Sequence, residues 1–315
     1  MRIFRHDKVA AADRGAVVAI GNFDGVHLGH QRVIGVAGER ARALAAPHAV
    51  LTFEPHPRSV FRPDDPPFRL TPFRVKSRRL EALGVDLLFT LHFDLAFAAK
   101  SAEEFIAEVL VQGIGARTVV AGYDFVFGHG RRGTAALLRE RGQTLGFGVE
   151  TVDPVESQDG VAYSSTHIRE HLTAGRPRQA AALLGRFWEI DGRVERGDQR
   201  GRTIGFPTAN ILLQDYLRPA PGVYAVRAGI EEGSRTLWRD AVANFGRRPT
   251  FGGSDLRLEV HLFDYDGDLY GRHLRVALID FLRPEQKFAG IDALKAQITA
   301  DAAYARTILA TVPAF

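Results

Sequence analysis

The chain has 315 residues, of which 45% are hydrophobic and 25% charged, and it is long enough for two domains with sizeable cores. It contains no cysteine, which excludes a disulfide framework, thiol catalysis and metal sites with cysteine ligands. Small anionic ligands suffice to explain the net charge of +4, and no apolar run has the length of a signal peptide or a membrane span, so we expect a cytoplasmic protein without a membrane role.

Strand-like and helix-like segments alternate through the first half of the chain. The strand-like runs cover residues 16–20, 49–53, 85–91 and 118–121, with a weaker run at 147–152. The helix-like segments cover residues 28–45, 72–83, 101–112 and 134–141, and a helix near 166–174 with a short alanine-rich segment closes this half. The alternation predicts a parallel sheet whose chemistry lies in loops at the carboxyl ends of its strands.

The stretch "AIGNFDGVHLGHQ" (19–31) places two histidines where the first long strand gives way to a helix. His27 and His30 would lie near the helix N-terminus, where backbone N–H groups lack partners and the helix dipole is positive. Gly29 would let an anion approach the backbone closely. His56 follows the next strand and can face the same crevice. The pattern therefore predicts a group of donors for phosphate oxygens.

Two other interpretations of these histidines remain open. Each histidine could be a helix cap or a packed core residue. His27, His30 and His56 could also coordinate zinc, with Asp24 nearby. Their spacing differs from the HExxH arrangement on one helix, and nucleotidyl transfer needs only cationic donors and magnesium held largely by the phosphates.

Four blocks in the first half resemble one known enzyme module. "GNFDGVHLGH", "TFEPHPR", "GYDFVFGHGRRG" and "YSSTHIRE" occur in this order and look like the FAD synthetase module of bacterial bifunctional riboflavin kinase/FMN adenylyltransferases, in the nucleotidyltransferase superfamily. The resemblance implies a Rossmann-like domain over residues 1–185 in which His27 and His30 are catalytic. It also implies that the site for ATP and its phosphates includes Gly21, Phe23, Asp24, Gly29, His56, Asp124, Ser165, Thr166 and Arg169.

Some residues of these blocks depart from the family or have a simpler explanation. His167 stands where the family commonly has Arg or Lys, and Val126 stands where Arg is frequent, which lowers the positive charge expected around the phosphates. Ser165 and Thr166 would also serve as an ordinary helix cap. Asp124 lies in a glycine-bounded turn, where aspartate is common for backbone reasons alone.

The pattern changes after about residue 185. Short β-like runs cover residues 187–195, 223–229, 236–243, 256–263 and 269–281, and Gly, Pro and Asp separate them. These runs predict an antiparallel barrel or sandwich. Residues 290–310 have apolar side chains at helical spacing and predict a closing amphipathic helix.

The segment "GRTIGFPTAN" (201–210) has the composition of a phosphate and magnesium site. Gly201 and Gly205 can shape a loop around a phosphate, and Pro207 stiffens the exit of that loop. Thr208 and Asn210 would place two oxygens on one side of an extended segment, where they suit Mg²⁺. A glycine- and proline-rich turn into an edge strand is the alternative.

The second half resembles riboflavin kinase. The segment just described and the blocks "PGVYAV", "NFGRRPTF", "LEVHLFDYDGDLYG" and "FLRPEQKF" follow in the order of that family, which implies a kinase domain over residues 186–315. The resemblance assigns the catalytic base to Glu259, which would otherwise be a solvated strand carboxylate. It places the flavin near Arg283 and Glu285, and Phe245 stands where an aliphatic residue is usual.

Together the two resemblances imply one enzyme with two activities. The second half would phosphorylate riboflavin with ATP to FMN, and the first half would transfer AMP from ATP to FMN, giving FAD and pyrophosphate, with Mg²⁺ as cofactor. Association between copies of the chain is left open. A kinase that has lost adenylyl transfer and a flavin- or RNA-binding regulator are the alternatives, but the chain lacks an aromatic RNA-binding block or a dense basic stripe, so we expect no nucleic-acid partner.

Overall fold

A computed structural model describes residues 1–155, 160, 163–196, 201, 205–233, 235–250, 253–313 and 315. These residues form two compact units. The N-terminal unit contains Met1–Pro66 and Thr71–Ser164, and the C-terminal unit contains Pro67–Leu70 and Ser165–Phe315.

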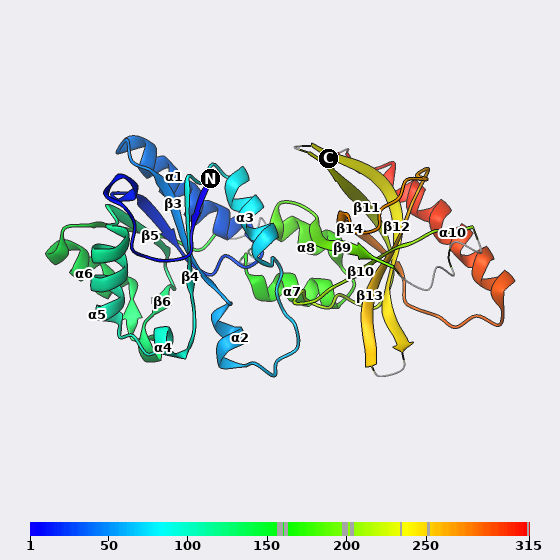
Figure 1. Ribbon diagram of the computed structural model, residues 1–315, viewed down its shortest axis with the longest axis horizontal. Helices are drawn as coiled ribbons and strands as arrows, with labels where there is room; N and C mark the ends of the chain where they lie inside the picture. Colours follow the sequence, from blue (N-terminus) through cyan, green and yellow to red (C-terminus); the bar gives the residue numbers. More distant parts are fainter. Residues whose placement is uncertain are drawn as a thin grey trace. The chain divides into compact units, whose positions relative to one another are not determined.

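The N-terminal unit is built on a parallel sheet with helices beside it (Figure 1). The sheet has six strands in the order β1-β4-β3-β2-β5-β8. Its strands are β1 (Arg2–Phe4), β2 (Val17–Ile20), β3 (His48–Glu54), β4 (Leu87–His92), β5 (Thr118–Gly122) and β8 (Gly148–Val152). The helices are α1 (Leu28–Ala43), α2 (Pro57–Phe61), α3 (Phe73–Ala82), α4 (Leu95–Ala98), α5 (Ala102–Glu104), the π-helical segment η2 (Phe105–Ile114) and α6 (Ala135–Leu145). Short 3-10 turns η1 (Ala11–Asp13) and η3 (His129–Arg131) and a small hairpin of β6 (Val126–Phe127) and β7 (Gly133–Thr134) complete the unit.

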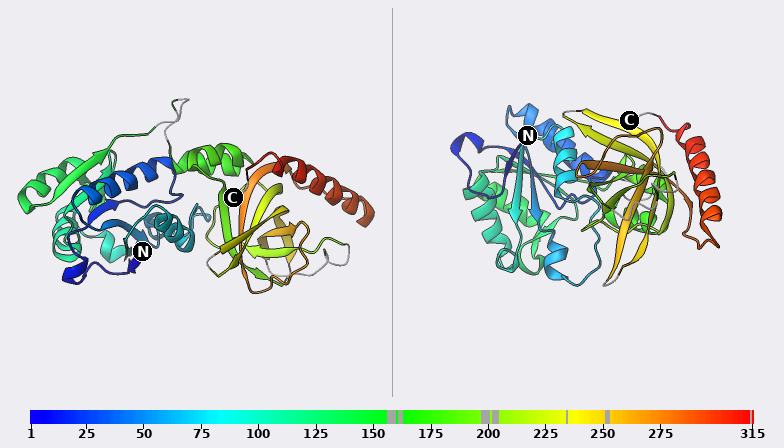
Figure 2. Two further views of the ribbon diagram at one scale, coloured as in Figure 1. Left: turned by 90° about the horizontal axis from the view of Figure 1, so that it is seen from above. Right: turned by 45° about the vertical axis from the view of Figure 1, so that its right-hand side comes forward.

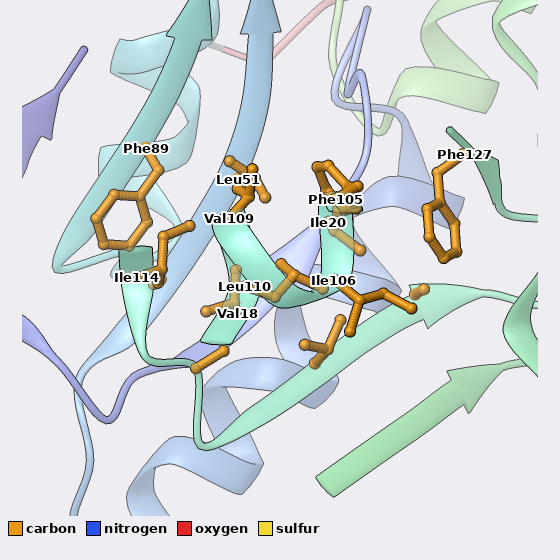
Figure 3. Packing of buried hydrophobic residues seen from close by; sticks show 14 of the residues in the cluster. Val18, Ile20, Leu51, Phe89, Phe105, Ile106, Val109, Leu110, Ile114 and Phe127 are labelled. Carbon is orange, nitrogen blue, oxygen red and sulfur yellow. The ribbon is translucent and has the colours of Figure 1, made fainter. Parts of the chain in front are cut away.

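Apolar side chains cover both faces of this sheet, as a parallel sheet requires. On one face Val18 and Ile20 pack with residues of η2 such as Ile106 and Leu110 (Figure 3). On the other face Val17 packs with the buried side of α1. The short strand β2 is buried along its whole length, so its end provides a rigid base for the loop that follows.

The order of the strands reverses at β2. β2 pairs with β3 on one side and with β5 on the other, so the chain moves outward in opposite directions from this point. Ligands of open α/β sheets bind outside the carboxyl ends of the strands at such a reversal. The loops that follow β2, β3 and β5 therefore meet at the edge where a site is expected.

The C-terminal unit is a closed antiparallel barrel (Figure 2). Its strand order is β10-β13-β12-β11-β14-β9. Its strands are β9 (Trp188–Glu195), β10 (Ala209–Leu212), β11 (Gly222–Glu232), β12 (Arg235–Thr250), β13 (Gly253–Leu262) and β14 (His273–Arg283). Its helices are α7 (Ser165–Thr173), α8 (Pro177–Leu184) and α10 (Ile291–Leu309). Helix α10 covers the outer face of β11, β12 and β14 with Ala305 and Leu309 in the shared apolar cluster.

The predicted fold class is confirmed, and the second half is a barrel and not a sandwich. The alanine-rich segment before residue 185 forms helix α8, because Pro177 opens it and Gly185 ends it in a left-handed conformation. Strands β1 and β10 were not among the predicted strands, because three- and four-residue strands leave little periodicity to read.

Candidate active sites

His27 and His30 lie where β2 gives way to α1, as predicted. His27 is the N-cap of α1, and its Nδ1 accepts a hydrogen bond from the backbone N–H of His30 at 3.3 Å. The two imidazole rings stack with their centroids 3.6 Å apart. Because Nδ1 of His27 accepts, the neutral ring carries its proton on Nε2, which leaves Nε2 as the donor of this side chain.

The glycines of this loop make room for aromatic rings. Phe23 has a positive φ of 48°, and its buried ring contacts His30 edge to face at a centroid distance of 5.3 Å. A Cβ at Gly21 would lie 3.1 Å from the Phe23 ring, and a Cβ at Gly29 would lie 3.2 Å from the ring of His27. The two glycines therefore let Phe23 and His27 fold over the backbone, and Phe23 supports His30 from the core side.

Asp24 fixes the turn that precedes the histidines. Its carboxylate is 2% exposed and accepts from the backbone N–H and the hydroxyl of Thr71 at 2.9 and 3.3 Å. The same hydroxyl accepts from the backbone N–H of Gly25 at 2.8 Å. These bonds tie the turn to residue 71, so the described contacts of Asp24 are with the protein itself.

His56 and Asp124 lie after the two strands that flank β2. His56 is the N-cap of the short helix α2 and accepts from the backbone N–H of Arg58 at 3.1 Å. Asp124 is exposed in a turn closed by the hydrogen bond from Phe125 N–H to Gly122 O at 3.1 Å. The sheet thus brings His27, His56 and Asp124 to one edge, as the motif order predicted.

Ser165, Thr166 and Arg169 lie in the first turns of α7, in the C-terminal unit. Arg169 donates from Nε to the backbone carbonyl of Phe68 at 2.9 Å. Its guanidinium lies 5.5 Å from the centre of the Phe68 ring. The arginine therefore holds the Pro67–Leu70 segment, which belongs to the same unit.

An aromatic cluster near the ends of β3 and β4 was missed by the sequence analysis. The ring of Phe93 lies 5.7 Å from that of Phe53, 5.8 Å from that of Phe61 and 5.7 Å from that of Phe97. Phe61 in α2 is 60% exposed although it belongs to this packed group. The only sequence signal was phenylalanine at strand ends, which a buried core explains equally well.

Two cavities meet at Thr208 in the C-terminal unit. One, of about 650 Å³, is lined by the β-strand residues Val194, Ala209 and Val260 and by the 265–270 loop. The other, of about 380 Å³, lies between the outer face of the barrel and α10 and is lined by Glu259 among others. Thr208 lines both cavities, so this residue is common to their walls.

Three polar residues lie side by side on neighbouring strands next to Thr208. Glu259 on β13 pairs with Asn210 on β10 and with Asn244 on β12. Residues paired in this way point to the same face of an antiparallel sheet. Asn210 is 5% exposed, and within the described part of the chain its Oδ1 is buried without a hydrogen-bond partner. An orphaned carbonyl oxygen beside a threonine hydroxyl suits a hard cation such as Mg²⁺.

The loop before Thr208 has the backbone that glycine permits. A Cβ at Gly201 would lie 2.3 Å from the carbonyl oxygen of Phe206, and Gly205 has a φ of +90°. The carbonyl of Pro207 lies 2.9 Å from Nδ1 of His261, which therefore donates to it. His261 was not singled out by the sequence analysis, although it is two residues from Glu259 on the same face of β13.

Arg283 and Glu285 line the smaller cavity, and each forms hydrogen bonds with another residue that lines it. Arg283 donates from Nε and Nη2 to the carboxylate of Asp301 on α10 at distances from 2.7 to 3.1 Å. Glu285 accepts from the amide of Asn244 at 3.2 Å and lies against Gly246, where any Cβ would clash with its carboxylate. The two side chains connect the strand ends with α10 around the cavity.

The described residues contain no group of three or more His, Asp or Glu placed to hold a metal ion. The stacked rings of His27 and His30, with one Nδ1 in a backbone hydrogen bond, fit the donor interpretation better than the zinc interpretation. Among the described helices, none is both long and apolar enough to cross a membrane.

Comparisons with known proteins give a match for each half of the chain. The model of the FAD synthetase family matches residues 9–167, and the model of the riboflavin kinase family matches residues 184–309. Proteins named bifunctional riboflavin kinase/FMN adenylyltransferase are similar over nearly the whole chain: that of Escherichia coli K12 is 43% identical over 97% of each chain, and that of Bacillus subtilis 168 is 37% identical over 94% of this chain and 93% of the relative. A solved structure from Streptococcus pneumoniae, named as a macrolide-efflux protein, is 35% identical with a TM-score of 0.85 and covers 97% of this chain and 98% of that one.

Proposed function

Because this chain belongs to the bifunctional riboflavin kinase/FMN adenylyltransferase family, we propose that residues 1–185 carry adenylyl transfer at the His27 loop and residues 186–315 carry phosphorylation at Glu259. The enzyme phosphorylates riboflavin with ATP to give FMN and transfers AMP from ATP to FMN to give FAD and pyrophosphate. The FAD synthetase part is N-terminal and the riboflavin kinase part is C-terminal.

In the adenylyl transfer we assign His27 and His30 to charge stabilisation. An oxygen of the FMN phosphate attacks the α-phosphorus of ATP, the bond to the bridging oxygen breaks, and pyrophosphate leaves with the electron pair. The Nε2–H of His27 would donate to the oxygens on which charge grows. Support comes from the position of both rings at the N-terminus of α1, beside the reversal of strand order at β2.

We assign the flavin ring of FMN in this reaction to the aromatic cluster that contains Phe61. A planar ring such as isoalloxazine packs well on an aromatic side chain. Phe61 is the exposed member of a packed group and lies in α2, the helix that His56 caps. An apolar platform in α2 would then lie close to His56, the proposed phosphate donor that caps this helix.

In the phosphorylation we assign Glu259 as the general base. Its carboxylate would accept the proton of the ribityl 5′-hydroxyl while that oxygen attacks the γ-phosphorus of ATP and ADP leaves. The arrangement that carries this proposal is the pairing of Glu259 with Asn210, next to Thr208, where the two cavities meet. The larger cavity would hold ATP, and the smaller, more apolar one would hold the flavin.

Thr208 and Asn210 would hold Mg²⁺ at the kinase site through the hydroxyl and Oδ1. The buried Oδ1 of Asn210 lacks a partner among the described residues, which fits a ligand role. Bound Mg²⁺ supplies positive charge to the phosphates of ATP. The loop closed by the bond from His261 to the Pro207 carbonyl keeps Thr208 in place beside this amide.

We further propose that the enzyme acts in the cytoplasm, where ATP for both reactions is made, and that it needs no nucleic-acid partner. The chain has no cysteine and a modest net charge of +4, which agree with this assignment.

One experiment tests the whole assignment. The protein is incubated with riboflavin, ATP and Mg²⁺, and the flavins are separated by chromatography over time. FMN should appear first and FAD should follow. FMN without FAD would show a kinase that has lost adenylyl transfer, and salt-sensitive RNA binding without turnover would favour a regulator.

A further inference from the structure

A lysine of the N-terminal unit is completely buried next to the turn that leads from β2 to His27. Lys76 lies in α3 and is 0% exposed. Lysine is almost never fully buried without partners, because removing its charge from water is costly. A side chain in this position cannot contact a substrate in solution, so any effect on the reaction must pass through its neighbours.

The ammonium group of Lys76 contacts the loop after β2 and the last residues of β3. Its Nζ donates to the backbone carbonyl of Asn22 at 2.9 Å and to Oε1 of Glu54 at 3.1 Å. The hydroxyl of Thr52 lies 3.4 Å from Nζ and donates to the same Asn22 carbonyl at 3.2 Å. Asn22 therefore accepts from two buried donors.

These contacts lie at the start of both histidine-bearing loops. Asn22 opens the turn that leads to His27, and the next residue, Phe23, has a positive φ of 48° that a phenylalanine rarely adopts. Glu54 ends β3, two residues before His56. We propose that Lys76 is a positioning residue for adenylyl transfer, which holds the His27 loop and the His56 loop at one fixed separation.

Stability alone is a weaker explanation of the buried pair. The cost of dehydrating both charges often exceeds the attraction between them, so a buried ion pair contributes little net stability. The pair can affect the rate more than the stability, because it fixes the position of the catalytic loops. A displacement of about 1 Å in a pre-organised site can reduce the rate by roughly 10²-fold. The inference rests on the proposed role of His27 and His30 in this reaction.

A matched pair of threonines provides the first test. Thr52 on β3 and Thr90 on β4 are register partners, and both are buried. The hydroxyl of Thr52 bonds to Asn22 O, whereas the hydroxyl of Thr90 has no hydrogen-bond partner among the described residues. We expect Thr52→Val to lower kcat for FAD formation from FMN by about tenfold and Thr90→Val to leave it unchanged. Equal kcat values for both variants and the parent would overturn the proposal.

Lys76→Met provides the second test, because methionine keeps the buried length without the charge. We expect kcat for FAD formation to fall by roughly 10²-fold while riboflavin phosphorylation by the same molecules is unchanged. Leu80→Ala, one turn further along α3 and also fully buried, is the control for lost stability, and its folded fraction should keep the parental kcat. If Lys76→Met does not fold, the kcat of Thr52→Val, compared with that of Thr90→Val, decides whether the proposal stands.

A double variant separates positioning from a general structural effect. If Lys76 acts through the histidine loop, adding His27→Ala to Lys76→Met should cost far less than His27→Ala costs in the parent, because the two changes remove the same interaction. Losses that multiply in full would refute the positioning role. Unchanged FAD formation in His27→Ala alone would instead refute the proposed catalytic role of that histidine, so the two failures are distinguishable.

Discussion

The change Glu259→Gln tests the kinase assignment most directly. Glutamine keeps the size of the side chain and its place between Asn210 and Asn244 on the neighbouring strands, but it does not accept a proton at neutral pH. General-base catalysis contributes roughly 10²–10⁴-fold. Since Thr208 and Asn210 remain in place to orient ATP, we expect the rate of riboflavin phosphorylation to fall within this range without complete loss.

The assay measures FMN formed from riboflavin under saturating ATP and Mg²⁺, with FAD formed from supplied FMN as the internal control. Glu195→Gln is the matched control, because Glu195 pairs with Asn210 from the opposite strand, β9, but lines neither cavity. Its phosphorylation rate should equal that of the parent. Glu259→Asp, which withdraws the carboxylate by about 1 Å, should give an intermediate rate.

Three results would count against the reasoning. A parental rate in Glu259→Gln would show that this carboxylate is not the base. An equal loss of the phosphorylation rate in Glu195→Gln and Glu259→Gln would show that negative charge beside Asn210 is required, whichever of the two carboxylates supplies it. An equal loss of FAD formation in Glu259→Gln would point to a general defect of the chain.

Four further outcomes are expected. His27→Ala should slow FAD formation from FMN by roughly 10²-fold or more with riboflavin phosphorylation intact, and stoichiometric zinc lost on this change would favour a metal site. Asn210→Ala should raise the Mg²⁺ concentration for half-maximal phosphorylation by roughly tenfold or more, and an unchanged magnesium titration would remove this amide from the site. Burial lowers the pKa of His48, so below about pH 6.5 this imidazole takes up a proton in the unfolded chain before it does so in the folded one, and the fold loses stability. The free energy of chemical unfolding should therefore fall less between about pH 7.5 and pH 5 in His48→Gln than in the parent. Equal losses of stability would contradict this. A fragment of residues 165–315 should resist unfolding better than one of residues 186–315, because α8 packs on β9 and β14 of the barrel, and equal midpoints would show that this packing adds no stability.

The position of the histidines could be predicted because it depends on local patterns. An apolar run that ends in glycine, followed by a helical period, places His27 at a helix start whatever the rest of the chain does. The role of Asp24 depends instead on a distant partner. Asp24 contacts Thr71, which is 47 positions away, and no spacing in the sequence indicates that pairing.

The same limit applies to Lys76 and Arg283. A lysine in an amphipathic helix is ordinarily solvated, and only the tertiary structure shows that this one faces a backbone carbonyl beneath a loop. The motif assigns Arg283 to the flavin site but gives no sign of its bidentate pair with Asp301 on α10, which only the tertiary structure shows. Motifs identify which residues gather at a site but not the tertiary contacts that hold them there.

The boundary between the two halves shows why composition alone divides a chain imperfectly. The segment Pro67–Leu70 belongs by its contacts to the barrel unit, although it lies far upstream in the sequence. Its Leu70 carbonyl accepts from the buried indole N–H of Trp188 at 2.8 Å, and Arg69 exchanges backbone bonds with the 215–217 segment. A buried donor without its acceptor would cost about 1–3 kcal/mol, so these few residues stabilise the barrel although the family model for the kinase begins at residue 184. Helix α7 has a similar dual position, since it carries the serine and threonine assigned to adenylyl transfer and belongs by its contacts to the barrel unit. The unit in which a residue packs is therefore a separate question from the reaction that it serves, and each needs its own experiment.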